Sequence, residues 1–199
     1  MNASRGPGQR AGLSRERVIE AARELLDEGG VDVLSIRALA DRVGVKPNAI
    51  YSHVENKALL IDHLLDDVLA AVETPDPAIM DPVAGMHTAM ASTYEVLVAH
   101  ADLVALYLAR QGARGPNAQH LGKVILLLLG RLHITGQQAQ EALDVLIVYT
   151  LGSAAFATRT TPTSVSPPRT TSGNHAERFE LGLSWLLAGI TMPTESAHS

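Results

Sequence analysis

A group of hydrogen-bonding side chains lies between positions 35 and 57, in two short segments with helical spacing. They carry hydroxyl, guanidinium, ammonium, imidazole and amide groups, which proteins direct at phosphates and base edges. A helix too short to be stable alone, with small and polar residues on its free face, suits insertion into the major groove of DNA. The sequence therefore predicts a DNA-binding surface formed by Ser35, Arg37, Lys46, Pro47, Asn48, Ala49, Tyr51, Ser52, His53 and Lys57.

Side-chain chemistry indicates roles within this surface. Arg37 lies in the first turn of its helix and can reach a phosphate or the O6 and N7 atoms of guanine. Asn48 can read adenine, and Ala49 can contact the methyl group of thymine. Lys57 begins a further helix, where a cation beside exposed amides forms a good phosphate site, although a solvated lysine is the alternative. For His53, a contact with phosphate or sugar and a structural role both remain open.

Two helices with a tight turn between them must position these side chains. The apolar residues of the first helix, Ile36 to Val43, fall at i, i+3, i+4 and i+7. Ser35 is the expected N-cap, with a contact to phosphate as a further role, and Gly44 is expected to end the helix with a positive φ. Pro47 then opens the second helix, where the missing N–H of proline costs nothing.

The composition favours an all-helical protein. The 199 residues are 46% hydrophobic but only 4% aromatic, and no run of alternating β-branched residues indicates a strand. Cysteine is absent, which excludes disulfides and thiolate metal sites. The N-terminal residues show no apolar signal segment, and the longest aliphatic run, residues 124–129, is far shorter than the ~20 residues that cross a bilayer. We therefore expect a cytoplasmic all-α protein.

The charges are unevenly distributed. The net charge is −5, which alone argues weakly against a nucleic-acid binder. Residues 1–57 hold nine Arg/Lys and eight Asp/Glu, a net of +1, whereas residues 58–199 hold seven and thirteen, a net of −6. Within the first part, the basic groups gather around the two short helices at Arg37, Arg42, Lys46, His53 and Lys57.

Composition also divides the chain. A flexible tail is expected at 1–13, and a first helical region at 14–73. Three prolines between Thr74 and Pro82 mark the boundary with a second helical region, 74–192. Within that region, residues 159–174 are rich in Thr, Ser and Pro and are expected to form a flexible loop. About nine helices are expected in all.

The sequence resembles the Tet repressor (TetR) family of bacterial transcription regulators. The resemblance covers roughly residues 14–72 and lies in the order of helices and in a signature within the two short helices and the start of the next. The matched residues are Ser35, Ile36, Arg37, Leu39, Ala40, Val43, Gly44, Val45, Ile50, Tyr51, His53, Val54, Asn56, Lys57 and Leu60.

This resemblance implies a function and a division of labour. Region 14–73 would be a three-helix helix-turn-helix DNA-binding domain, and region 74–192 a helical ligand-binding and dimerisation domain. The family implies a homodimeric repressor that binds a palindromic operator and is released by a small organic molecule. Tyr51 matches a tyrosine that donates to a DNA phosphate in the family, and packing in the small core is the alternative. A regulator that binds DNA constitutively, or with a protein partner, remains the alternative function.

An enzyme is not expected, because the sequence contains no Ser-His-Asp arrangement, paired acids at a pocket or nucleotide-binding loop. No cofactor or metal is expected either. The Tet repressor chelates magnesium–tetracycline through a His and a Glu, and aligned positions fall near Tyr107 and Phe156, which are poor Mg²⁺ ligands. A neutral or weakly polar organic effector is therefore favoured.

The second region also supplies candidates for the ligand pocket and the dimer. Met and aromatic residues at helical spacing can line a pocket, although plain core packing is the alternative. The pocket candidates are Met86, Met90, Tyr94, Tyr107, Leu108, Tyr149 and Phe156. Helices at about 135–158 and 175–190 are the candidates for a dimeric four-helix bundle, in which Trp185 anchors the partner or belongs to the core of its own subunit.

Overall fold

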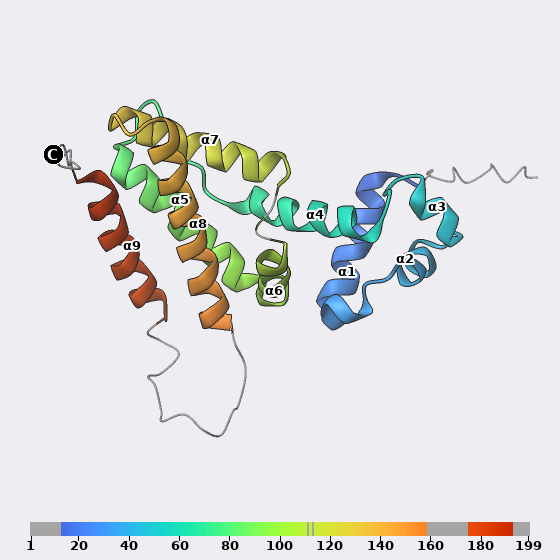
Figure 1. Cartoon of the computed structure of the whole chain (residues 1–199). Helices are drawn as coiled ribbons and strands as arrows, with labels where there is room; N and C mark the ends of the chain where they lie inside the picture. Colours follow the sequence, from blue (N-terminus) through green and yellow to red (C-terminus); the bar gives the residue numbers. More distant parts are fainter. Residues whose placement is uncertain (1–12, 111, 113, 159–174, 193–199) are drawn as a thin grey trace, which may run out of the picture. The chain divides into compact units, whose positions relative to one another are not determined.

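The computed structural model of the chain describes residues 13–110, 112, 114–158 and 175–192. All regular structure in these ranges is helical and comprises nine α-helices and one short 3-10 turn (Figure 1). The expectation of an all-α fold with about nine helices is confirmed. The flexible tail expected at 1–13, except for its last residue, and the loop expected at 159–174 lie outside the described residues.

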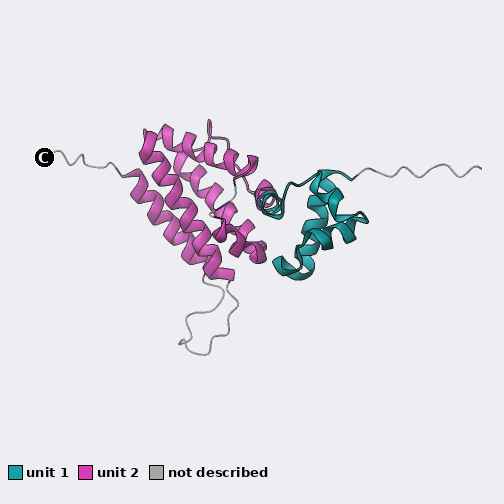
Figure 2. Cartoon of the chain, turned by 45° about the vertical axis from the view of Figure 1, so that its right-hand side comes forward, with its two compact units in different colours: residues 1–64 teal, residues 65–199 magenta. Residues whose placement is uncertain are grey.

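The chain forms two compact units, Met1–Leu64 and Leu65–Ser199 (Figure 2). The division falls inside a helix, whereas composition placed a boundary after residue 73. The N-terminal unit contains α1 (Arg15–Val33), α2 (Ile36–Val43), α3 (Pro47–Tyr51) and the first part of α4 (Lys57–Val68). The boundary between Leu64 and Leu65 lies within α4, so this one helix contributes residues to both units.

Short-range capping sets the ends of the first helices. The Ser14 hydroxyl accepts a hydrogen bond from the backbone N–H of Arg17 at 3.2 Å, and the Ser35 hydroxyl accepts one from Ala38 at 3.1 Å. Gly44 ends α2 with a φ of 71°. α1 has a kink at Gly29–Gly30, where the backbone leaves helical geometry, and a short helical stretch follows to Val33. These caps fix where α2 and α3 begin and end.

A small apolar core holds the helices of the N-terminal unit together. Each helix turns the apolar side of its periodic pattern inward, so that the polar side faces solvent. The fully buried side chains are Val18, Ala21, Ala22, Leu34, Leu39, Ala40, Ile50, Leu60 and Leu64.

The C-terminal unit is a bundle of longer helices. After the 3-10 turn η1 (Leu69–Ala71), it contains α5 (Pro82–Ala99), α6 (Ala101–Ala109), α7 (Pro116–Arg131), α8 (Gly136–Thr158) and α9 (His175–Thr191). By length and composition α8 could cross a membrane, and the bent pair α5–α6 passes that test only when joined. One side of α8 packs against α5, α6, α7 and α9, but only 22% of its apolar window is buried within the chain, so another apolar side stays exposed.

A buried carboxylate connects α4 to the start of α7. Asp66 is 5% exposed and accepts hydrogen bonds from the backbone N–H groups of Asn117 at 3.2 Å and Ala118 at 2.9 Å. The Asn117 side-chain amide donates to the same carboxylate at 3.2 Å. A side chain at Gly115 would overlap this carboxyl group, so the approach to α7 needs glycine there. Asp66 is thus the cap of α7, supplied from a distant helix.

Three aromatic rings fasten α9 to the bundle. Phe179 stacks on Tyr94 of α5, with ring centroids 4.1 Å apart, and its centroid is 5.5 Å from that of Tyr149 of α8. The Tyr149 hydroxyl also donates to the backbone carbonyl of Phe179 at 3.0 Å. It lies where a side chain at Gly182 would be, so α9 approaches α8 closely at that glycine. The position of α9 is therefore set by side-chain contacts with α5 and α8.

Candidate nucleic-acid interface and ligand cavity

The predicted DNA-binding residues share one property, which is access to solvent at α2, α3 and the start of α4. Ala49 and His53 are half-buried, and the other eight are exposed. Tyr51 is 51% exposed, so it is not a core aromatic residue. Between them, Leu39, Ile50 and Leu60 face inward and are fully buried. The fold therefore offers all ten side chains from one framework, while their individual contacts with DNA stay predictions.

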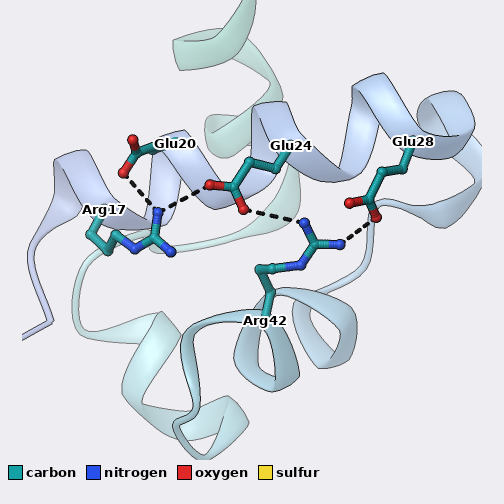
Figure 3. Close-up of polar contacts among 5 residues, drawn as sticks. All are labelled: Arg17, Glu20, Glu24, Glu28 and Arg42. Carbon is teal, nitrogen blue, oxygen red and sulfur yellow. Dashed lines mark hydrogen bonds and ion pairs between the residues drawn. The ribbon is translucent and has the colours of Figure 1, made fainter.

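Some basic residues near α2 and α3 form ion pairs with acidic residues of the protein, and others do not. Arg42 binds Glu24 of α1 at 3.2 Å and also pairs with Glu28 (Figure 3). Arg17 contacts Glu20 at 2.7 Å and Glu24 at 3.2 Å. Hydrogen bonds from Arg42 and then Arg17 hold the pKa of the Glu24 carboxyl below its usual value. Arg42 is thus bound by α1, which corrects the sequence-based view that it adds to the basic cluster.

Three cations remain for an external partner. The side chains of Arg37, Lys46 and Lys57 are exposed and form no hydrogen bond or ion pair with the part of the chain that the structure describes. Asn48, the second residue of α3, is also exposed. A set of exposed cations around a short polar helix can bind phosphates and present a hydrogen-bonding amide to base edges.

The C-terminal unit contains a cavity of about 130 Å³. Side chains from η1 and from α5, α6, α7 and α8 form its wall, with Gly112 from the segment before α7. The residues that line it are Leu69, Met90, Thr93, Leu97, Tyr107, Gly112, Ala118, Leu121, Gly122, Leu143, Ile147, Thr150 and Leu151. The wall is largely apolar, as expected of a site for a small organic molecule.

The seven pocket candidates occupy four different places. Met90 and Tyr107 line the cavity. Met86 is fully buried, and Tyr94 and Tyr149 belong to the ring stack on Phe179. The last two candidates, Leu108 and Phe156, line a separate apolar groove of about 450 Å³ between α6 and α8. Sequence reasoning missed Thr93 and Thr150, because a threonine inside an apolar helix gives no signal that it faces a void.

The polar groups of the cavity already have partners in the protein. The Thr93 hydroxyl donates to the carbonyl of Ala89 at 2.7 Å, and the Thr150 hydroxyl donates to that of Leu146 at 2.8 Å. The Tyr107 hydroxyl donates to the carbonyl of Leu65 in α4. Burial raises the pKa of Tyr107 well above its usual value, so it keeps its proton and remains a donor.

The part of the chain that the structure describes contains no cluster of three His, Asp or Glu residues that could hold a metal ion. Tyr107 donates its hydroxyl hydrogen to Leu65, and Phe156 is 68% exposed in the groove. Neither side chain offers the carboxylate oxygen that Mg²⁺ prefers.

Comparisons with known proteins match the N-terminal unit and the whole helical chain to different extents. The family model for bacterial regulatory proteins of the tetR family matches residues 18–64. The chain is 48% identical over 60 residues to the class D tetracycline repressor protein of Escherichia coli, which covers 30% of this chain and 28% of that protein. The chain thus matches less than a third of the length of this curated relative.

Solved structures are similar over nearly the whole chain. ActR of Streptomyces coelicolor in complex with actinorhodin shares 26% identity and a TM-score of 0.79, covering 94% of this chain and 100% of that chain. A single-residue variant of TetR from Acinetobacter baumannii, in complex with minocycline, shares 26% identity and a TM-score of 0.74, covering 89% and 96%. The similarity therefore extends beyond the N-terminal unit to the helical body.

Proposed function

Because this chain belongs to the TetR family of transcriptional regulators, we propose that it is a repressor that binds operator DNA as a homodimer and is released by a small organic molecule. The observation that carries the proposal is the surface of α2, α3 and the start of α4. There Arg37, Lys46 and Lys57 are exposed and unpaired among the described residues, around the exposed Asn48. A regulator of this kind acts on chromosomal DNA, so we also propose a cytoplasmic location.

The same surface supports a division of roles between two kinds of contact. Lys57 and Tyr51 would bind phosphates and set the register on DNA, independently of sequence. Asn48 and Ala49 at the start of α3 would enter the major groove and read base edges. Arg37 in the first turn of α2 would reach a base or a phosphate.

A homodimer is supported by apolar residues that the described part of the chain leaves exposed on α8 and α9. On α8, Val148 is 70% exposed and Val145 is 45% exposed. On α9, Trp185 is 68% exposed and Leu181 is 51% exposed. Large exposed apolar patches mark interaction surfaces, and a two-fold dimer would bury this patch of one copy against the same patch of the other. Two recognition helices would then read half-sites ~34–36 Å apart, which requires a palindromic operator.

Release by a ligand is supported by the cavity in the C-terminal unit. ActR and the A. baumannii TetR variant were each solved with an organic molecule, and this chain has a largely apolar cavity in the corresponding helical body. A constitutive or protein-partnered regulator would not need such a space. The cavity therefore favours the ligand-responsive form over that alternative.

Selection of DNA from a random pool, with the full-length protein, tests the proposal directly. We expect a palindrome whose half-sites are one helical turn apart, and binding that weakens when an effector occupies the cavity. The recovered operator then serves as the probe in a ligand screen that measures DNA release. Recovery of no shared sequence motif would refute the proposal of an operator-binding repressor.

A further inference from the structure

The hydroxyl groups that line the cavity are available to a ligand as hydrogen-bond acceptors, because their hydrogens are already donated to the protein. Thr93, Thr150 and Tyr107 each direct the hydroxyl hydrogen at a backbone carbonyl, of Ala89, Leu146 and Leu65 respectively. A hydroxyl that donates in this way keeps lone pairs that can still accept a hydrogen bond. A ligand in the cavity would therefore satisfy these oxygens by donating.

The start of α7 would be the natural place for an anion in this wall, and it is already occupied. Ala118 lines the cavity, but its backbone N–H donates to the Asp66 carboxylate at 2.9 Å, and the N–H of Asn117 donates to it at 3.2 Å. Pro116, the first residue of the helix, has no N–H to offer. The carboxylate of the protein itself thus takes the donors that an anionic ligand would use.

Charge and size restrict the ligand further. The described residues that line the cavity include no Lys, Arg or His, so an ionised acid would be buried without a counter-charge, which is costly. The volume, about 130 Å³, is close to the ~150 Å³ of an engineered apolar cavity that binds benzene.

We propose that the cavity takes a neutral molecule about the size of one six-membered ring that donates a hydrogen bond through a hydroxyl or N–H group and carries no ionised acid. This inference rests on the proposed function, because it names the chemical class of the effector. The donor would lie against the hydroxyl oxygens of Thr93 and Thr150, and the ring against Met90, Leu97 and Leu143.

Three probes of similar size separate the elements of this proposal. Phenol has a ring and a donor, toluene has the ring alone, and benzoate has a ring and a negative charge at neutral pH. Calorimetric titration of the full-length protein should show saturable binding of phenol and none of benzoate. Benzoate that binds as tightly as phenol would overturn the exclusion of acids.

Removing the acceptors tests the hydrogen bond itself. The double variant Thr93→Val, Thr150→Val keeps side-chain shape and removes both oxygens. Phenol affinity should fall roughly three- to tenfold while toluene affinity is unchanged or rises, since one net hydrogen bond is lost. An equal change for both probes, or none for phenol, would overturn the proposed donor contact.

A filling variant locates the binding place. Ala118→Leu adds bulk to the cavity wall and should abolish phenol binding, whereas Ala84→Leu adds the same bulk at an exposed position of α5 and should not. Circular dichroism confirms that each variant is folded. Phenol binding that survives in a folded Ala118→Leu protein would place the ligand elsewhere and refute the inference.

The outcomes also separate this inference from the proposed function. If phenol binds in the cavity and the protein stays on its operator, ligand release as a function is refuted and the chemistry of the cavity is upheld. If the operator is released by an acid while phenol does not bind, the function is upheld and the inference is overturned.

Discussion

Replacing Asp66 by alanine is expected to destabilise the C-terminal unit by about 3 kcal/mol. The carboxylate is 5% exposed and accepts from two backbone N–H groups of α7, those of Asn117 at 3.2 Å and Ala118 at 2.9 Å. A hydrogen bond to a charged group contributes roughly 1.5 kcal/mol or more, and two such bonds give the expected loss. The Asn117 side-chain amide can turn toward solvent in the variant and adds no further loss.

Asp81→Ala is the matched control. Asp81 caps α5 in the same way, but it is exposed and accepts from one backbone N–H, that of Ala84 at 2.9 Å. Loss of an ordinary cap costs about 1 kcal/mol. The two variants therefore compare a buried cap with an exposed cap made by the same residue type.

Urea unfolding followed by helical circular dichroism measures both variants. Protein concentration must be held constant, because the stability of the proposed dimer would depend on it. The midpoint for Asp66→Ala should fall clearly below that for Asp81→Ala. Equal midpoints would refute the reasoning that burial of the Asp66 carboxylate makes its hydrogen bonds to α7 the stronger cap.

Three further predictions concern DNA binding and assembly. Lys57→Ala should weaken binding to every DNA sequence and lower the salt slope by about one, whereas Asn48→Ala should alter preference at one base pair; fluorescence anisotropy across salt concentrations distinguishes them. Arg42→Ala should leave the salt slope of DNA binding unchanged, and a changed slope would contradict this. The variant should also have a lower free energy of unfolding above pH 4.5, the usual pKa of the Glu24 carboxyl. Because the ion pair lowers that pKa in the folded protein, its contribution to stability is lost as pH falls. Trp185→Glu should give a monomer in sedimentation, and an intact dimer would exclude α9 from the interface.

Local features of the fold could be predicted from the sequence because their partners lie within one helical turn. Ser14, Ser35 and Asp81 each accept from a backbone N–H three residues later. Gly44 takes the positive φ expected at the end of α2, and Pro47 opens α3. Such contacts depend on neighbouring residues alone, so the pattern of the helix-turn-helix predicts them without knowledge of the tertiary fold.

Features made by distant residues could not be predicted in this way. Asp66 and Asn117 lie 51 positions apart, and periodicity gives no signal that one caps the helix of the other. Arg42 looks basic in a local charge count, but packing of α2 on α1 brings it to Glu24 and Glu28. The cavity also could not be predicted from the sequence. Helical periodicity indicates which side of each helix is buried, but it does not show where the buried sides of several helices leave a space between them.

The stacked rings of Tyr94, Phe179 and Tyr149 have a consequence for how two subunits would communicate. Tyr94 follows Thr93, which lines the cavity, while Phe179 and Tyr149 belong to the helices that carry the exposed apolar patch. A side chain at Gly182 would overlap the Tyr149 hydroxyl, so α9 lies close against α8 there, and a shift of α5 at the stacked rings would reach both helices. In the proposed dimer, filling one cavity would therefore strain the shared interface, and the two cavities would bind cooperatively rather than independently.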